Sequence, residues 1–115
     1  DLVTGVQTCA LPISAARVIA AKEADLGIIV CGSGVGVSIV ANKVPGVRAA
    51  LCTHAYVAAM SRAHNDANVL CLGARVVGVD LAKSIVDAFV RGEFEGGRHA
   101  ERVQKIHALD EENAS

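Results

Sequence analysis

Aromatic side chains are scarce in this sequence: only 3% of its 115 residues are Phe, Trp or Tyr, although 52% are hydrophobic. The core must therefore be built from Val, Ile, Leu and Ala, a composition that suits buried parallel strands covered by helices. Long apolar runs are also missing, since no stretch reaches the ~18 residues that a membrane span needs. The sequence thus indicates one α/β domain and gives no reason to expect a membrane as a partner.

Neither sign of charge dominates, because the formal net charge is -1 at pH 7. A balanced charge gives no reason to expect nucleic acid as a partner. The start of the sequence lacks a basic segment followed by an apolar stretch, so no secretory signal is predicted. The cysteines include no Cys-x-x-Cys pair. We therefore expect no disulfide framework, no metal site and a location in the reducing cytoplasm.

The first fourteen residues differ in character from the rest of the chain. Asp1–Ser14 shows no helical or strand period, and Pro12 interrupts any regular element there. The stretch Thr4–Ile13 (TGVQTCALPI) also matches one reading frame of a common short-read sequencing adapter at every position. We therefore predict that residues 1–14 are a non-native segment and that residues 15–115 carry the fold.

The remaining residues alternate between short apolar runs and helix-favouring segments. Strands are predicted at Leu26–Cys31, Val47–Leu51 and Val69–Leu72. Helices are predicted at Ala15–Ala24, Val37–Lys43, His54–Ala63 and Arg98–Glu112, and Thr53 is the predicted N-cap of the third. A further helix is predicted to begin at its cap Asp80, with Leu81, Ile85 and Phe89 on one face. This alternation implies right-handed crossovers and a parallel sheet, that is, a Rossmann-like three-layer αβα sandwich.

A glycine-rich loop, Cys31–Gly36 (CGSGVG), follows the first of these strands. Its glycines let successive backbone N–H groups converge, and the next helix start adds positive potential, so the loop is expected to bind an anion. It matches neither the nucleoside-triphosphate loop nor the dinucleotide fingerprint. Cys31 lies at a strand end before a helix, which favours the thiolate. A buried, inert cysteine is the alternative, and we interpret Cys52 and Cys71 in that way.

Two arginines and one histidine are further candidates. Arg98 and Arg102 lie four positions apart on the last predicted helix, so both can hold a phosphate from one helix face. The alternative is a solvated face beside Glu101. His64 follows a helix end, where a histidine serves as a helix cap more often than as a catalyst.

Several stretches, in order and with similar spacing, resemble the type B ribose-5-phosphate isomerases. They are Cys31–Gly36, Ala41–Lys43, Arg48–Leu51, Arg62–Leu70, Leu72–Arg75 and Glu93–His99. The resemblance implies a sugar-phosphate isomerase, an intramolecular oxidoreductase of the pentose phosphate pathway that needs no metal or other cofactor. Such an enzyme interconverts ribose 5-phosphate and ribulose 5-phosphate through an enediolate.

The resemblance also implies a role for each matched residue. Cys31 would be the base that moves a proton between C2 and C1, and His64 would assist ring opening. The loop backbone would hold the enediolate oxygen, and Ser33, where a threonine is usual, keeps the hydroxyl. The substrate-binding residues would be Gly32, Ser33, Gly34, Val35, Gly36, Asn65, Arg75, Arg98 and Arg102, the last two at the phosphate.

Active sites in this family are shared between two subunits, so a homodimer is implied. The family also begins with a strand ending in an Asp-His pair, a helix and a second strand, all ahead of the part matched here. The resemblance therefore implies that residues 15–115 are the C-terminal part of a single isomerase domain that lacks its first strands. It further implies that Leu26–Cys31 has an unpaired edge and that the chain as written is inactive.

Other readings stay open at this point. The alternative among enzymes is a galactose-6-phosphate or allose-6-phosphate isomerase, since these belong to the same superfamily. A different class of answer is a non-catalytic α/β module that only binds a phosphorylated metabolite. Turnover in a full-length parent, lost in Cys31→Ala while sugar-phosphate binding is retained, separates an enzyme from a binding module.

Overall fold

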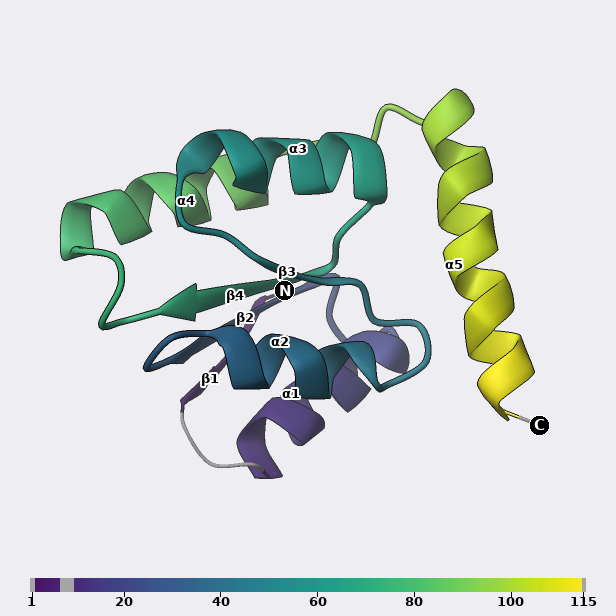
Figure 1. Ribbon diagram of the computed structural model, residues 1–115, viewed down its shortest axis with the longest axis horizontal. Coiled ribbons are helices and arrows are strands. Elements are labelled where there is room, and N and C mark those ends of the chain that lie inside the picture. The colour runs from purple at the N-terminus through teal and green to yellow at the C-terminus, as the bar shows by residue number, and fades with distance from the viewer. Residues whose placement is uncertain (1, 7–9, 115) are drawn as a thin grey trace.

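A computed structural model describes residues 2–6 and 10–114 of the chain (Figure 1). Within them, strands and helices alternate up to β4, and two helices then follow. The bounds are β1 Leu2–Val6, α1 Ala10–Ala20, β2 Leu26–Cys31, α2 Val35–Asn42, β3 Ala49–Leu51, α3 Ala55–Asn65, β4 Val69–Gly73, α4 Val79–Arg91 and α5 Arg98–Ala114. In the described ranges no helix is both long and apolar enough to cross a bilayer.

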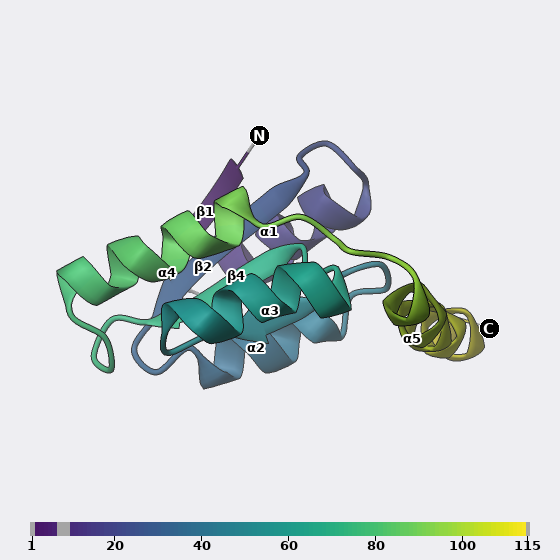
Figure 2. The same ribbon diagram turned by 90° about the horizontal axis from the view of Figure 1, so that it is seen from above.

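The sheet is parallel throughout, with the strand order β1-β2-β4-β3. The chain moves across the sheet in one direction from β1 to β2 to β3 and then steps back to β4. Right-handed crossovers place α1 and α2 on one face and α3 on the other. α3 and α4 do lie together opposite α1 and α2 (Figures 1 and 2). The predicted three-layer sandwich with a parallel sheet is confirmed.

Two hydrophobic cores lie on the two faces of the sheet. β4 is an inner strand, and all of its residues are buried. Because successive side chains of a strand point to opposite faces, Ile29 and Cys71 enter the core beneath α1 and α2. Ile28 and Leu70 enter the second core, beneath α3 and α4, in which Phe89 is also buried. Both cores contain few aromatic rings, as the composition predicts.

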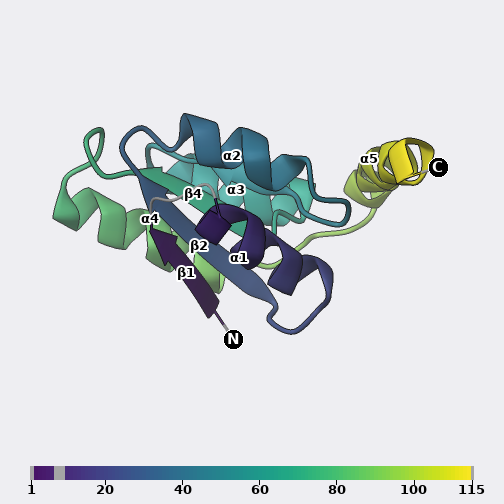
Figure 3. The ribbon, with the colours of Figure 1, turned by 90° about the horizontal axis from the view of Figure 1, so that it is seen from below.

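β1 is the main difference from the sequence-based expectation. Leu2–Val6 pairs with β2 in the register Leu2↔Leu26 to Val6↔Val30 (Figure 3). The prediction of an unpaired Leu26–Cys31 edge is therefore wrong, because β2 has a neighbour on each side. Any extended segment offers backbone N–H and C=O groups to an open strand edge, whether or not its side chains alternate.

α1 also starts earlier than expected. It begins at Ala10 instead of Ala15 and contains Pro12. Proline is tolerated in the first turn of a helix because the N–H groups there have no partner within the helix. The conformation does not bear on whether residues 1–14 are foreign to the natural protein, so that origin stays a prediction; positions 1 and 7–9 lie outside the described residues.

Two predicted helix caps are wrong. His54 rather than Thr53 caps α3, and Gly78 rather than Asp80 caps α4, with no side-chain hydrogen bond in either case. Asp80 instead lies in the first turn of α4, where a negative charge complements the helix dipole. Leu81, expected on the buried face, is 40% exposed, because the first turn of α4 extends past the end of β4 (Figure 1).

Phe89 is the largest fully buried side chain among the described residues. Phe89→Ala should lower the free energy of unfolding by about 3–5 kcal/mol, because apolar contacts are lost and a cavity remains. Val90→Ala, at the neighbouring position but 40% exposed, should change it by less than about 0.5 kcal/mol. Urea unfolding followed by circular dichroism measures both. Equal losses would contradict the placement of the second core.

Candidate active site

The loop between β2 and α2 brings the predicted base and the anion-binding backbone together. Cys31 is the last residue of β2, and its Sγ accepts a hydrogen bond from the N–H of Gly34 at 3.2 Å. Gly34 has φ 84°, a left-handed conformation that favours glycine. The hydroxyl of Ser33 accepts a hydrogen bond from the N–H of Val35, the first residue of α2, at 3.3 Å. The loop is therefore ordered around the sulfur.

The end of β4 holds this loop from the other side. The N–H of Arg75 donates to the carbonyl of Gly32 at 3.0 Å. Gly73 packs so closely that a Cβ on it would overlap the Ser33 carbonyl. The Arg75 side chain passes over Gly32, since a Cβ there would lie 3.8 Å from Arg75 Cδ. We call Cys31–Gly36 together with Arg75 the thiol cluster.

A second group of predicted residues gathers where α3 ends and α5 begins. The rings of His64 and His99 are stacked, with centroids 4.2 Å apart and planes inclined by 12°. Oε1 of Glu95 lies 3.8 Å from His64 Nε2 and 3.6 Å from His99 Nε2. The histidine cluster is defined as His64, Asn65, Glu95, Arg98, His99 and Arg102. Arg98 and Arg102 are exposed, and among the described residues neither guanidinium has a hydrogen-bond or ion-pair partner.

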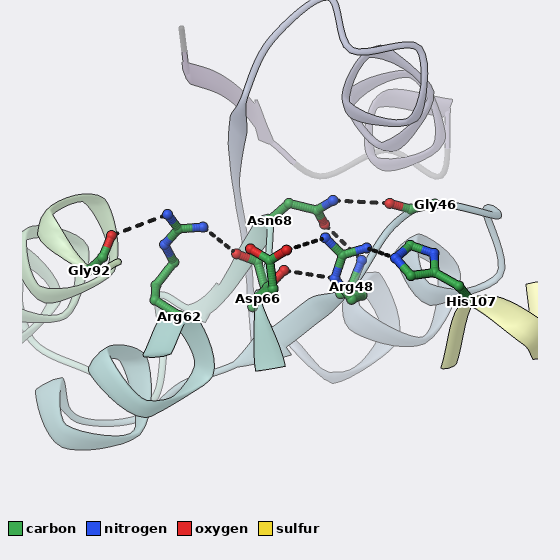
Figure 4. A network of polar contacts seen from close by, with 8 residues as sticks. Gly46, Arg48, Arg62, Asp66, Asn68, Gly92 and His107 are labelled. Atoms are coloured by element: carbon green, nitrogen blue, oxygen red, sulfur yellow. Dashed lines mark hydrogen bonds and ion pairs between the residues drawn. The ribbon is translucent and has the colours of Figure 1, made fainter. Parts of the chain in front are cut away.

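The turn after α3 is held by two arginines (Figure 4). Asp66 caps α3 in the left-handed conformation, with φ 49°. Arg48 Nε donates to the Asp66 carbonyl at 2.7 Å, and its Nη2 lies 3.4 Å from the Asp66 carboxylate. Arg62 donates to the carbonyls of Ala67 at 2.8 Å and Gly92 at 3.2 Å. These contacts fix the last turn of α3, and with it the histidine cluster, against β3 and α4.

α5 lies beside the sandwich rather than on the sheet (Figures 1 and 2). Arg48 Nη1 lies 3.2 Å from His107 Nε2, and the N–H of Gly46 donates to the Asp110 carboxylate at 2.8 Å. Because a guanidinium only donates, His107 Nε2 is the acceptor in this contact. Leu109 of α5 is 57% exposed and lines a cavity of about 460 Å³ between α5 and the sandwich. Polar contacts thus fix the position of α5, and part of its apolar surface stays uncovered.

The two clusters lie at opposite edges of the sheet. Cys31 pairs with Gly73, the last residue of β4, so the thiol cluster is at the carboxyl edge. His64 precedes Val69, the first residue of β4, so the histidine cluster is at the amino edge. Figure 1 shows the β2–α2 and β4–α4 loops at one end of the molecule and α5 at the other. One chain therefore does not bring Cys31 and His64 together.

Sequence reasoning gave no role to three residues that build or support the histidine cluster: Arg48, Glu95 and His99. Glu95 and His99 lie four positions apart, a spacing that allows their side chains to touch on the same face of a helical turn. Nothing in the sequence indicates that His99 meets His64, because that contact joins the end of α3 to the start of α5. Arg48 is likewise distant in sequence from Asp66 and His107.

One group of side chains in the described part of the chain could hold a metal ion: His64, Glu95 and His99, whose ligand atoms lie within 4.8 Å of one another. A zinc ion binds imidazole nitrogen in the plane of the ring, at about 2.0–2.1 Å. The two rings are nearly parallel and stacked, so their in-plane lone pairs do not point at a common position. This geometry therefore does not suit a metal ion held by both imidazoles.

The buried cysteines differ from Cys31. Burial raises the pKa of Cys71 to about 12, and the neighbouring Cys31 and Cys52 add to the rise. Burial also raises the pKa of Cys52, against a smaller opposite effect of its hydrogen bond with Ser61. Both side chains are therefore neutral thiols, as expected for core residues. Of the cysteines that the structure describes, Cys31 alone is partly exposed.

The close contact at Gly73 can be tested directly. Gly73→Ala should displace the Ser33 peptide, because the added Cβ meets backbone atoms that no side-chain rotation can move away. The rate of Cys31 alkylation by iodoacetamide, located by peptide mass spectrometry, should then change by about threefold or more. Gly78→Ala, where a Cβ meets nothing within 4 Å, is the matched control. An unchanged rate in Gly73→Ala would show that this contact does not position the thiol cluster.

Comparison with known proteins identifies relatives of the whole sandwich. A sequence model of the Ribose/Galactose Isomerase family matches residues 6–106. Ribose-5-phosphate isomerase B of Escherichia coli is 53% identical over 96 residues, which are 84% of this chain and 64% of that protein. The chain therefore spans just under two thirds of the length of this curated relative.

Solved structures agree with this match. Ribose-5-phosphate isomerase B of Clostridium thermocellum is 53% identical and superimposes with a TM-score of 0.89, covering 91% of this chain and 71% of that one. The Mycoplasma genitalium enzyme, solved with bound ribulose-5-phosphate, is 43% identical with a TM-score of 0.88, covering 92% and 70%. The family match spans most of the chain and includes both clusters, and the solved relatives have the same fold: the chain belongs to the ribose/galactose isomerase family.

Proposed function

We propose that the protein is an aldose–ketose isomerase that interconverts ribose 5-phosphate and ribulose 5-phosphate, a step of the pentose phosphate pathway. One observation carries this proposal: a partly exposed thiol, Cys31, ends a strand beside a glycine-rich loop, and the backbone N–H of Gly34 in that loop donates to its sulfur. This is the arrangement that proton abstraction next to a carbonyl requires, because a base and an anion-stabilising backbone lie together. Membership of the family and its ribulose-5-phosphate-bound relative support the choice of substrate.

In the proposed reaction Cys31 removes the proton from C2 of the open-chain aldose. The electron pair of that C–H bond forms the C1=C2 double bond, and the C1 oxygen takes up the negative charge. The N–H groups of Gly32–Gly36 stabilise this enediolate. The thiol then returns the proton to C1 while the hydroxyl proton moves from the C2 oxygen to the C1 oxygen, which yields the ketose. No electrons enter or leave, so no cofactor is needed.

His64 is the proposed catalyst of ring opening, which must precede isomerisation. Its imidazole takes the proton of the C1 hydroxyl and returns one to the ring oxygen as the ring bond breaks. Asn65, exposed beside it, is placed to bind sugar hydroxyls. Arg75 lies over the glycine loop and would bind the substrate at the thiol cluster.

A homodimer would bring the two clusters together, with the thiol cluster of one copy facing the histidine cluster of the other. A two-fold axis then produces two identical sites, each built from both copies. The placement of Cys31 and His64 at opposite edges supports this arrangement. So do Ile106 and Leu109, exposed apolar residues of α5 that a second copy would cover. Cys31 must stay reduced to act as a base, which favours the cytoplasm.

The second candidate is an isomerase for a hexose 6-phosphate such as galactose 6-phosphate or allose 6-phosphate. The family, Ribose/Galactose Isomerase, includes pentose and hexose in its description. Neither cluster contains a feature that indicates whether the sugar has five or six carbons. Relative kcat/KM for pentose and hexose phosphates decides between these substrates. A non-catalytic module that binds the same phosphates would show binding without turnover.

We also propose that the chain as written does not turn over substrate, because the E. coli relative is longer and would supply further residues to the site. For comparison, an extended version of the chain carries the N-terminal segment of that relative ahead of Ala15. Turnover in the extended version and none in this chain is the expected result. Turnover in neither, with sugar phosphate bound by both, would favour the non-catalytic module.

The shared site predicts a specific pattern of complementation in the extended version. Cys31→Ala and His64→Ala should each be inactive as a homodimer. Mixed and re-associated in equal amounts, they should recover about a quarter of the wild-type activity, because half of the dimers are mixed and each contains one intact site.

The mixing experiment has its own control. Two batches of Cys31→Ala, carried through the same dissociation and re-association, should stay inactive. If the mixture of the two variants also stays inactive while the wild type recovers, the two residues do not meet across an interface.

Arg102 is predicted to bind the phosphate. Arg102→Ala should raise KM for ribose 5-phosphate about 10- to 100-fold with a smaller effect on kcat, because a charge-assisted hydrogen bond worth about 1.5–3 kcal/mol is lost. Arg102→Lys should recover part of the loss, since a point charge replaces a fork of donors. Lys83→Ala, an exposed cation on α4, is the control. A wild-type KM in Arg102→Ala would rule out this role.

A further inference from the structure

His99 is the one buried histidine among the described residues, with 7% of its surface exposed. Its ring lies flat against that of His64, at 4.2 Å between centroids and 12° between planes. The two rings come from different elements, the last turn of α3 and the first turn of α5. A buried ring in van der Waals contact restricts its neighbour, because rotation of the His64 imidazole out of the stack would drive its edge into His99.

The two rings differ in their burial and in the effect of neighbouring charges. Burial, followed by His64 and Arg98, lowers the pKa of His99; Glu95 acts in the opposite direction, and Arg102 adds a smaller lowering. His99 is therefore neutral at neutral pH. The His64 side chain is 38% exposed against 9% for His99, so water can solvate a charge on His64 but hardly one on His99. Two stacked imidazolium rings repel each other, so a charge on His64 disfavours a charge on His99.

The Glu95 carboxylate completes the arrangement. Its Oε1 is within 4 Å of Nε2 of both rings, so it stabilises a proton on either one. Burial opposes a charge on His99 more strongly than Glu95 favours one, so His99 stays neutral beside this carboxylate. The charge state of His99 thus follows from burial and not from its distance to Glu95.

We infer that His99 is a positioning residue for His64: its buried, neutral ring holds the plane of the His64 imidazole beside Glu95. The catalytic meaning of this inference rests on the proposed isomerase reaction, in which His64 gives a proton to the ring oxygen. The stack and the neutral state of His99 are properties of the chain itself, and they can be measured without turnover.

The first experiment uses nuclear magnetic resonance on this chain. Ring stacking shifts the Hε1 and Hδ2 resonances of His64, so these should move in His99→Ala and stay near their wild-type positions in His99→Phe, which keeps a flat ring. In the wild type, the ¹⁵N resonances of His99 should show a neutral ring at pH 7. Unmoved His64 resonances in His99→Ala, or a charged His99 at pH 7, would overturn the inference.

The second experiment uses stability as a function of pH. Because the pKa of His99 is lower in the folded chain than in the unfolded one, the unfolded state takes up more protons as pH falls through about 6.5. Stability is therefore full above that pH and declines below it. Between about pH 7.5 and about pH 5.5 the urea midpoint of His99→Phe should fall less than that of the wild type. An equal fall in both would contradict a neutral, buried His99.

The third experiment measures kinetics in the extended version. His99→Ala should lower kcat by about tenfold or more with KM nearly unchanged, because general acid–base catalysis depends on the orientation of the proton donor. His99→Phe should recover most of that loss, and Gln104→Ala, exposed on the same helix, should match the wild type. A wild-type kcat in His99→Ala would overturn the positioning role. If the wild type itself shows no turnover, the proposed function fails, and the resonance and stability measurements still decide the inference.

Discussion

The common direction of the strands determines where the two candidate clusters of this chain lie. In a parallel sheet each strand runs from the amino edge to the carboxyl edge, and each connecting helix returns the chain to the amino edge. Loops after strands therefore gather at one edge, where Cys31 and Arg75 meet. Turns after helices gather at the other, where His64 and His99 meet. Residues that the proposed reaction needs together thus lie apart within one chain, and this separation is the reason that the proposed site includes a second copy.

Each cluster is rigid for a different physical reason. The thiol cluster depends on backbone packing: Gly73 leaves no room for a side chain over Ser33, and the left-handed Gly34 directs an N–H toward the Cys31 sulfur. The histidine cluster depends on side-chain contacts, in which Arg48 joins the turn after α3 to α5 through Asp66 and His107. The first arrangement tolerates only glycine at two positions, whereas the second depends on hydrogen bonds that cross between distant segments.

Burial separates the reactive groups of the chain from the inert ones of the same type. Cys71 has a pKa raised to about 12 in the core, while Cys31 at the strand end is partly exposed and hydrogen-bonded to the backbone. The same contrast distinguishes the two histidines, because burial lowers the pKa of His99 beside the more exposed His64. In the proposed site this leaves Cys31 as the accessible thiol and His64 as the more accessible ring of the stacked pair.

The sequence alone determined the elements whose signals are local. The apolar run Leu26–Cys31, the glycine loop after it and the alternation of strands with helices predicted the parallel sandwich, and the position of β2 agrees residue by residue. Family-specific motifs placed the chain in the right family. Helix starts were less well predicted, because Thr53 and Asp80 are good capping residues that the backbone did not use. A cap depends on where the chain enters the helix, and packing decides that.

Only the tertiary structure decided the features that depend on distant partners. Leu2–Val6 became a strand because the open edge of β2 supplied hydrogen-bond partners, which no pattern within those five residues specifies. The stack of His64 on His99 and the Arg48 contacts depend on how α3, β3 and α5 pack. The separation of Cys31 from His64 is decided in the same way. Sequence patterns reflect the local conformational preferences of neighbouring residues along the chain, whereas these contacts depend on which distant segments the fold brings together.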